Sequence, residues 1–445
     1  MIRAGLGRAI ERISPRMILI AGFVLFLIYA WPGYVGWDTL THFMQARGGS
    51  YSDSHPPAVA RLFRVVELFI AGPAGVLLLQ AGCAFLGLHG ILARRLTPRA
   101  AALATVTIFV FPPIAGVTAY VVKDTLMAGF LLLGISFLLD DRPRRQRLGL
   151  GLLLLANLMR WNALAATFAP VILLHRWQPT LAGWRRYSIA LGVWLGVTGT
   201  ALVVNEVLAD RAEHYWYTAH AVQDVAGTLQ YMPDQTDDEM HALLAGLRLH
   251  PGEQLHQRFR ARYNPADYRQ IAWQADKLFE KPAGPLERAA IVRAWNQTVL
   301  AYPGAYFRYR WDNFKLLIKL ERPPTFSNVY LWFTVVAAPE TVAQLQHDAY
   351  PSRIQSALRG YSIAVSLTPV YFVFVYFAAC FVVLVLSVRH SLEAALCLSG
   401  IGYQLAWFFL APTTDFRYSQ WMMICALVSV SLLAARRSRF ARAPG

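Results

Sequence analysis

Residues 73–92 read PAGVLLLQAGCAFLGLHGIL, and these 20 residues contain no Asp, Glu, Lys or Arg. An α-helix rises about 1.5 Å per residue, so about 20 apolar residues match the roughly 30 Å hydrocarbon core of a bilayer. A helix on the surface of a soluble protein would have one polar face. The stretch therefore predicts a membrane-spanning helix.

Similar apolar stretches recur along the chain. Of its 445 residues, 56% are hydrophobic and 15% are charged, which is typical of an all-α polytopic membrane protein and not of a soluble domain. We expect ten spans, near 17–35, 73–92, 100–119, 121–139, 147–159, 161–176, 187–208, 363–388, 393–411 and 419–435. The fifth and sixth are short and meet at residues 159–162, which predicts a pair of tilted or half-depth helices.

Basic residues are distributed unevenly among the segments that connect these spans. The formal net charge of +16 would also suit a nucleic-acid-binding protein, but the Lys and Arg residues flank the apolar stretches, as topology signals do. Both terminal segments and every second connection together hold 19 Lys and Arg against four acids. Short segments rich in Lys and Arg stay in the cytoplasm, so we expect both termini there. Because membrane topology accounts for these basic residues, we expect no nucleic-acid partner.

The long segment 209–360 has a different charge balance. It holds 17 basic and 16 acidic residues, and long translocated regions escape the loop-charge rule. Its proline breaks and helical-period stretches, such as 285–314, predict a mostly helical extracytoplasmic cap. We expect the short apolar run 329–338 to be re-entrant or interfacial. The expected organisation is a transmembrane domain over 1–208 with a first outer loop at 34–72, the cap over 209–360, and C-terminal transmembrane helices over 361–445.

Twelve charged residues belong neither to the basic cytoplasmic segments nor to the segment 209–360. All twelve are expected at or near the outer membrane face. Charges near hydrocarbon are costly and are kept mainly where they are paired, solvated or functional, so this group marks the expected place of the chemistry. The acids are Asp38, Asp53, Glu67, Asp124, Glu206 and Asp415, and the bases are Arg47, Arg61, Arg64, Lys123, Arg160 and Arg417.

The first outer loop contains the candidate catalytic acids, Asp38 and Asp53, together with His55. The stretch 58–71 that follows is apolar except for three charged residues at every third position, which predicts a helix lying in the membrane interface. A carboxylate at the end of a first span suits a general base that takes the proton of an acceptor hydroxyl, with basic groups stabilising a departing phosphate. The alternative is that Asp38 caps a short helix beginning at Thr39.

This loop resembles the first outer loop of GT-C fold glycosyltransferases, notably the protein O-mannosyltransferases and the aminoarabinose transferases of lipid A. Asp38 is followed 17 residues later by His55, and the stretch 53–62, DSHPPAVARL, is similar to the mannosyltransferase form. The resemblance implies a catalytic base at Asp38, a polyprenyl-phosphate-linked sugar donor and a cavity open to the periplasm. Mannosyltransferases have an acidic pair where Asp38 is followed by Thr39, so we do not carry over that family's donor and acceptor.

Two further elements supply candidate phosphate-binding groups. Lys123-Asp124 opens the fourth span and resembles the Lys-Asp element of several bacterial membrane glycosyltransferases; the alternative is an ion pair with a snorkelling lysine. Arg160 interrupts an apolar stretch and suits bidentate binding of a phosphate. Its alternative is a structural pair with an inward-facing acid.

Residues 415–418, DFRY, lie between the last two spans and resemble the Asp-x-Arg-Tyr element of related membrane glycosyltransferases. The resemblance implies that Asp415 and Arg417 lie near the lipid phosphate and Tyr418 near the sugar. The alternative is a tight outer turn held by an Asp–Arg pair.

Metal and cofactor motifs are scarce. We interpret His55 as a hydrogen-bonding residue near the substrate, because no second ligand accompanies it at metal-binding spacing. We expect no required cofactor, although a divalent ion shared by Asp38 and Asp53 stays open. The absence of a P-loop, a dinucleotide fingerprint and a nucleophile elbow argues against ATP-driven, redox and hydrolase chemistry. The four cysteines lie in apolar stretches, and we interpret them as buried apolar residues.

These patterns predict an enzyme of the inner (plasma) membrane that moves a sugar from a polyprenyl-phosphate donor to a glycan, lipid or protein acceptor, with a periplasmic active site. A multi-span transporter or lipid flippase is the alternative, but it predicts midplane acids and internal repeats. A non-catalytic scaffold would give no reason for the outer charges to converge. The structural test is whether four side chains meet: Asp38, Lys123, Arg160 and Arg417.

Overall fold

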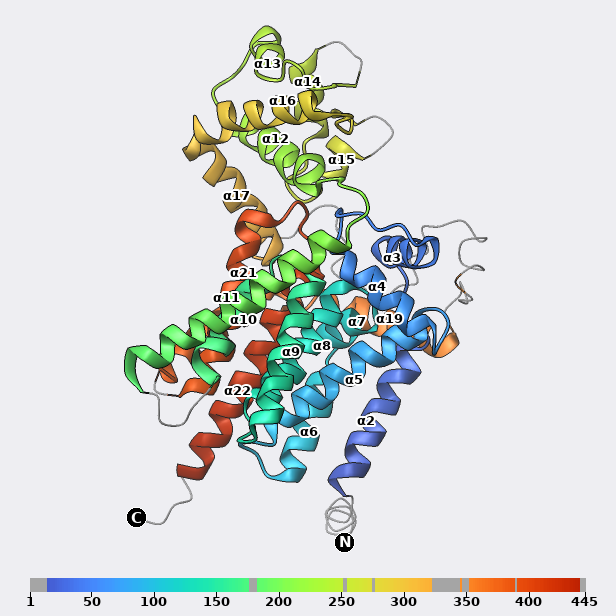
Figure 1. Ribbon diagram of the computed structural model, residues 1–445, viewed down its shortest axis with the longest axis vertical. Coiled ribbons are helices and arrows are strands. Elements are labelled where there is room, and N and C mark those ends of the chain that lie inside the picture. The colour runs from blue at the N-terminus through green and yellow to red at the C-terminus, as the bar shows by residue number, and fades with distance from the viewer. Residues whose placement is uncertain are drawn as a thin grey trace.

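The computed structural model describes residues 14–175, 182–250, 254–273, 277–321, 345, 352–388 and 390–440. Figure 1 shows a bundle of long helices below and a smaller group of helices above it. The secondary structure of the described residues is helical, with isolated bridges and no strands. The prediction of an all-α polytopic protein is confirmed.

The bundle is built from apolar helices, several of which begin with a proline. Proline suits the first helical position, because its missing N–H would have no partner there. The helices are α2 (Pro15–Ala30), α5 (Pro73–Leu92), α6 (Pro98–Phe109), α7 (Pro112–Ala119), α8 (Lys123–Leu138), α9 (Pro143–Met159), α10 (Ala163–Leu174), α11 (Gly183–Leu208), α20 (Val373–Leu386), α21 (Ser391–Leu410) and α22 (Gln420–Phe440).

By length and composition, four helical segments of the described chain are long and apolar enough to cross a membrane: α5, α11, α21, and 416–437, which includes α22. The pair α6 and α7 would make a fifth, and α2, α10 and α20 are shorter apolar helices. The chain is therefore an integral membrane protein. The expected break between two helices is confirmed, since α9 ends at Met159 and α10 begins at Ala163, although α9 already begins at Pro143 and is 17 residues long.

Two expected spans are wrong in detail, and prolines explain both. The stretch 100–119 is not one straight helix, because α6 and α7 meet at an angle of 68° where Pro112 follows Phe111. The stretch 363–388 breaks at Pro369 into α19 (Arg353–Ser366), the short 3₁₀ turn η3 (Pro369–Tyr371) and α20. Proline removes a helical hydrogen bond and keeps the preceding residue out of the helical region.

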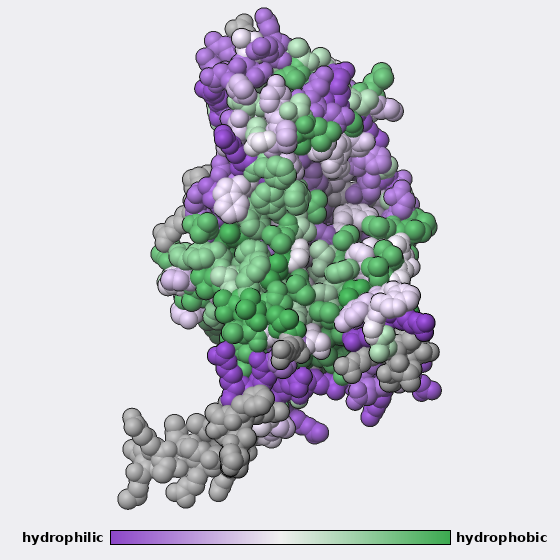
Figure 2. All heavy atoms as spheres, turned by 90° about the vertical axis from the view of Figure 1, so that its left-hand side faces the viewer, coloured by the Kyte–Doolittle hydropathy of each residue, from purple (hydrophilic) through white to green (hydrophobic). Residues whose placement is uncertain are grey.

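The two ends of the bundle differ. α2 begins and α22 ends far from the upper helices (Figure 1), and at that end Asp140 lies 3.1 Å from Arg145 and 3.6 Å from Arg94. Figure 2 shows apolar side chains over the middle of one face, with hydrophilic side chains above and below. Glu393, one of the four acids counted with the basic connections, is buried in the first turn of α21.

The upper helices form the cap and have a hydrophobic core of their own, which includes Val225, Phe259 and Ile291. The expected helical stretch 285–314 is confirmed, with an interruption before Pro303, whereas the run 329–338 lies outside the described residues. The elements are η1 (Trp216–His220), α12 (Ala221–Tyr231), α13 (Asp237–Leu243), α14 (Leu255–Arg262), α15 (Arg269–Ala272), α16 (Pro285–Trp295), η2 (Asn296–Leu300) and α17 (Pro303–Leu317).

α17 joins the cap to the bundle. Its Phe314 and Leu317 belong to the hydrophobic core of the bundle. Higher on the same helix, the buried Arg310 forms an ion pair with Asp224 of α12 and donates a hydrogen bond to the carbonyl oxygen of Ala411, at 3.1 Å. The cap is thus fastened to the end of α21.

The first outer loop folds into two helices, α3 (Trp37–Gly48) and α4 (Pro57–Glu67). The predicted helix within 58–71 is therefore confirmed as α4, which buries Val59 and Phe63. Arg47 of α3 and Glu67 of α4 form an ion pair at 2.7 Å. These contacts pack α3 against α4 above the bundle.

Candidate active site

Asp38 lies in the first turn of α3, where the positive end of the helix dipole favours a carboxylate. Gly36 is the N-cap residue, so the alternative in which Asp38 caps a helix beginning at Thr39 is wrong. The Thr39 hydroxyl accepts a hydrogen bond from the Gly36 amide and donates one to the carbonyl oxygen of Val121. The turn that carries Asp38 is thereby held against the residues that precede α8.

Three groups from three different elements surround the Asp38 carboxylate. Arg417 Nη1 lies 3.0 Å from Asp38 Oδ2, and Lys123 Nζ lies 3.4 Å from the same oxygen. His55 Nε2 lies 3.9 Å from Asp38 Oδ1. The Asp38 side chain keeps 19% of its surface exposed. It is therefore within reach of a ligand as well as of its cations.

The protonation of His55 follows from its neighbours. Lys123 Nζ lies 2.6 Å from His55 Nδ1. An ammonium group only donates, so Nδ1 accepts and a neutral ring carries its proton on Nε2, facing Asp38. Burial, followed by the positive charge of Lys123, lowers the pKa of His55 to about 3. His55 is therefore neutral at physiological pH.

The charge state of Asp38 reflects two opposed effects. Burial by itself would raise the pKa of this carboxyl group. The positive charges of Arg417 and Lys123 outweigh it and hold the pKa of Asp38 well below its usual range. Asp38 is an ionised carboxylate whose charge is neutralised by two cations.

Asp124 and Arg160 form a second, more deeply buried ion pair. The guanidinium of Arg160 also donates from Nε to Asn162 Oδ1 at 3.1 Å, and it lies over the rings of Trp407 and Tyr418, at 4.7 and 5.2 Å. Asp124 is therefore the inward-facing acid of the structural pair that we gave as the alternative role for Arg160. Arg160 is linked to the groups around Asp38 through its ion pair with Asp124.

Arg417 links the two pairs. Its Nε lies 2.9 Å from Asp415 Oδ2 and 3.9 Å from Asp124 Oδ2, and its backbone N–H donates to Asp415 Oδ1. Asp415 is also the N-cap of the short 3₁₀ turn η4 (Phe416–Ser419). Tyr418, expected near the sugar, stacks on Trp407 with ring centroids 3.8 Å apart. One arginine thus contacts three acids at once, because Asp38 is the third.

The structure brings together seven of the residues singled out in the sequence, which we call the Asp38 cluster. They are Asp38, His55, Lys123, Asp124, Arg160, Asp415 and Arg417.

Asp53 has different partners. Its Oδ1 accepts hydrogen bonds from the backbone N–H groups of Glu213 and His214, and its Oδ2 lies 3.3 Å from His214 Nδ1. The hydrogen bonds and ion pairs described for Asp53 fasten the first outer loop to the start of the cap. They do not join it to the Asp38 cluster, and so they give its expected catalytic role no support.

Sequence reasoning missed two rings beside His55. His42 is fully buried, and its ring centroid lies 5.1 Å from that of His55. Its position, one helical turn after Asp38 on α3, was a usable signal. Tyr215 of the cap has its ring 6.1 Å from His55 and shares a hydrogen bond with Tyr268 at 3.1 Å. The position of Tyr215 beside His55 depends on how the cap packs against the bundle.

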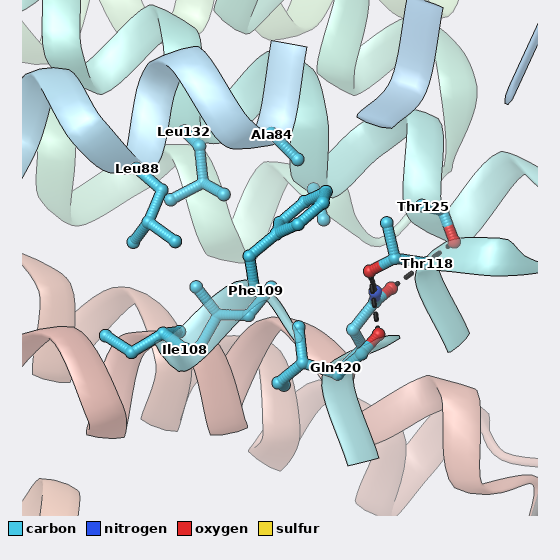
Figure 3. Close-up of a pocket in the computed structure, with 11 residues that line it drawn as sticks. Ala84, Leu88, Ile108, Phe109, Thr118, Thr125, Leu132 and Gln420 are labelled. Carbon is cyan, nitrogen blue, oxygen red and sulfur yellow. Dashed lines mark hydrogen bonds between the residues drawn. The ribbon is translucent and has the colours of Figure 1, made fainter. Parts of the chain in front are cut away.

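Neutral polar side chains lie close to Lys123 and Arg417 in the sequence and contact one another. Gln420 Nε2 donates to Thr118 Oγ1 at 3.0 Å, and Thr125 Oγ1 lies 3.5 Å from Gln420 Oε1 (Figure 3). Thr125 is two residues after Lys123, and Gln420 is three after Arg417. The three polar side chains line a cavity of about 10 Å³, which has room for about one water molecule.

No group of three or more His, Cys, Asp or Glu side chains close enough to hold a metal ion occurs in the described part of the chain. The three acids of the cluster each contact a Lys or Arg side chain instead. All four cysteines are free; Cys380, Cys397 and Cys425 are buried as predicted, whereas Cys83 is only partly buried.

No family model and no curated protein matches the chain. Among solved structures, it is similar to ArnT from Cupriavidus metallidurans in the apo state, with a TM-score of 0.34 and 14% identity over 96% of this chain and 78% of that one. It is also similar to ArnT bound to undecaprenyl phosphate, with a TM-score of 0.33 and 15% identity over 95% and 78% of the two chains.

Proposed function

We propose that this protein is a GT-C-like membrane glycosyltransferase that moves a sugar from a polyprenyl-phosphate donor to an acceptor on the extracytoplasmic side. The observation that supports it most is the Asp38 carboxylate with Arg417 at 3.0 Å and Lys123 at 3.4 Å. A base and phosphate-binding cations are the two components that such a transfer needs.

In the proposed reaction, the acceptor hydroxyl oxygen forms a bond to the anomeric carbon of the sugar as the bond from that carbon to the phosphate oxygen breaks. The electrons of the broken bond leave with the polyprenyl phosphate, and Asp38 takes the acceptor proton. Lys123 and Arg417 stabilise the developing negative charge on the phosphate. Atoms and charge balance without a further reactant.

Donor binding also changes Asp38. In the free site, Arg417 and Lys123 keep its pKa well below the usual range, which makes it a weak base. A phosphate that draws these cations toward itself removes part of their effect on the carboxylate, and a negative charge nearby raises its pKa further. The base becomes effective when the donor is present.

The other members of the Asp38 cluster position these groups. Asp124 and Arg160 hold Arg417 from one side, and Asp415 holds it from the other. His55 accepts a hydrogen bond from Lys123 and so orients its ammonium group. In this proposal Arg160 supports phosphate binding through Asp124 and Arg417.

The excess of Lys and Arg in the terminal segments supports the orientation. With both termini in the cytoplasm, the Asp38 cluster and the cap face the periplasm, because they lie at the other end of the bundle from the start of α2 (Figure 1). The donor reaches the site from the bilayer, and a glycan, lipid or protein acceptor reaches it from the aqueous side.

Incubating the purified protein with a panel of polyprenyl-phosphate sugars, and measuring the polyprenyl phosphate released, tests the proposal. We expect Asp38→Asn to lower turnover by roughly 10²- to 10⁴-fold, the usual contribution of a general base. Asp140→Asn, an equally small change at the other end of the bundle, serves as the control. Unchanged turnover in Asp38→Asn removes Asp38 from the base role. No turnover with any donor, together with lipid movement between leaflets of proteoliposomes, would favour a flippase.

A further inference from the structure

Two arginines of α4, Arg61 and Arg64, have no acidic partner. Six basic residues are expected at the outer membrane face, and the other four each contact a carboxylate: Arg47, Lys123, Arg160 and Arg417. Arg61 and Arg64 form no ion pair within the described chain. Charges beside hydrocarbon are kept mainly where they are paired, solvated or functional, so these two arginines are a candidate site for an anion.

Tyr51 holds both guanidinium groups. The guanidinium carbon of Arg61 lies 3.7 Å from the centre of the Tyr51 ring, and Arg64 Nη1 donates a hydrogen bond to Tyr51 Oη at 3.3 Å. Tyr51 is itself fixed, because it is fully buried and its backbone N–H donates to Asp210 Oδ2 at 3.0 Å. The two arginines are three residues apart on one helix, a spacing at which like charges repel. An anion bound between them would remove that repulsion.

Both arginines keep hydrogen-bond donors for a ligand. A guanidinium group has five N–H donors; Arg64 uses one of them on Tyr51, and Arg61 uses none within the described chain. Arg61 is partly exposed and Arg64 is exposed. Guanidinium groups bind phosphate through paired N–H···O bonds, and stacking on an aromatic ring fixes the plane of the group beforehand. The pair is therefore suited to a phosphate.

The end of α4 is apolar and exposed. Leu68 and Phe69 are 77% and 82% exposed, and Ile70 is half-exposed. The spanning helix α5 begins three residues later, at Pro73. α3 and α4 lie at the end of the bundle that faces the cap (Figure 1). Residues 68–70 therefore lie where the chain enters the membrane, and lipid is the apolar phase available to cover them.

The position of the two arginines follows from the geometry of the helix. Arg64 is at most about 6 Å from Leu68 along the helix axis, and Arg61 at most about 10 Å, at about 1.5 Å per residue. The headgroup layer on each side of a bilayer is roughly 5–8 Å thick. Even an upright α4 would place Arg64 in this layer, and a helix lying in the interface places both arginines there. Their spacing of three and four residues puts Arg61, Arg64 and Leu68 on one side of the helix.

We propose that Arg61 and Arg64 bind the phosphate of an anionic phospholipid, whose acyl chains contact Leu68, Phe69 and Ile70. A zwitterionic phospholipid has a cation of its own beside the phosphate, so two arginines without acids favour a headgroup with a net negative charge. The ligand is a lipid and not a free phosphate, because the apolar residues follow the arginines along the same helix. The site is separate from the Asp38 cluster and goes beyond the proposed reaction.

Photocrosslinking tests the site in the full chain. The protein is placed in phosphatidylcholine nanodiscs that contain a small, equal fraction of either phosphatidylglycerol or phosphatidylcholine with a photoreactive acyl chain. Crosslinks within 57–72 are then counted by mass spectrometry. We expect phosphatidylglycerol to label this segment about 25-fold more than phosphatidylcholine, at about 5-fold for each arginine, the effect of one basic side chain at an anionic lipid surface. Arg61→Met with Arg64→Met should bring the ratio near one.

Two further pairs of changes separate charge from apolar contact. Arg142→Met with Arg144→Met removes the same charge from two exposed residues at the other end of the bundle, and it should leave the labelling ratio within 57–72 unchanged. Leu68→Ser with Phe69→Ser should lower labelling by both lipids and leave their ratio unchanged. In the wild type, raising the salt from about 0.1 M to about 1 M shortens the screening length from about 10 Å to about 3 Å and should reduce the ratio without any substitution.

The opposite results would overturn the proposal. A wild-type ratio that persists in Arg61→Met with Arg64→Met, or at high salt, shows that these arginines do not select the lipid. An equal loss in Arg142→Met with Arg144→Met shows that net charge alone sets the ratio. Glycerophosphoglycerol, the headgroup without acyl chains, should not compete at the concentration of the lipid. If it does compete, the site takes a free phosphodiester and the assignment to a lipid is wrong.

Discussion

Replacing Asp124 should destabilise the protein more than its small size suggests. Its side chain is 1% exposed and pairs with Arg160, whose own side chain is 9% exposed. Asp124→Asn removes the negative charge and leaves a buried guanidinium without a counter-ion, which costs about 3–5 kcal/mol. At about 2 °C per kcal/mol, the low end for large domains, the melting temperature should fall by about 6–10 °C.

Thermal unfolding in nanodiscs, followed by tryptophan fluorescence, measures the effect. Asp140→Asn is the control, because Asp140 pairs with arginines whose side chains are 50% and 38% exposed, and such surface pairs contribute about 0–1 kcal/mol. The double variant Asp124→Leu with Arg160→Met should recover most of the loss, since an apolar pair often replaces a buried ion pair at no net cost. If Asp124→Asn and Asp140→Asn have the same melting temperature, Arg160 does not depend on Asp124 and our description of the pair is wrong.

Three further outcomes are expected. Asp53→Ala should loosen the junction with the cap by about 1–3 kcal/mol, seen as faster proteolysis near 209–214, while turnover falls far less than in Asp38→Asn. The pKa of His55, about 3 against an ordinary 6.5, means that between these values the unfolded chain binds a proton that the folded protein does not. Melting temperature should therefore fall as the pH drops below about 6.5, and His55→Gln should reduce that slope; an unchanged slope would show that His55 is already charged. EDTA should leave turnover unaffected, and loss of activity that Mg²⁺ restores would reveal a divalent ion.

The convergence of the outer charges could be predicted because hydrocarbon tolerates few unpaired charges. Lys123, Arg160 and Arg417 each interrupt or border an apolar stretch, so each is visible in the sequence without knowledge of the fold. Their approach to Asp38 then follows from placing the ends of several spans at one membrane face. The pairing within the group could not be predicted, because Arg417 has three acids within reach.

Asp38 and Asp53 show where sequence reasoning stops. Both lie in the first outer loop, and composition does not distinguish them. Their different partners depend on where the cap begins, because Asp53 binds backbone groups of Glu213 and His214, about 160 residues later.

Gln420 has a consequence for how the proposed enzyme works during turnover. Cations that bind a phosphate change partners as it arrives and leaves, so a scaffold held together by those same ion pairs would relax with every cycle. The segments that carry Arg417 and Lys123 are instead both fastened to the last turn of α7 by neutral hydrogen bonds, from Gln420 Nε2 to Thr118 Oγ1 and from Thr125 Oγ1 to the carbonyl oxygen of Val117, which neither ionic strength nor protonation near neutral pH disrupts. Part of the support for the two cations is therefore independent of their charge, and it persists while the site exchanges its electrostatic contacts.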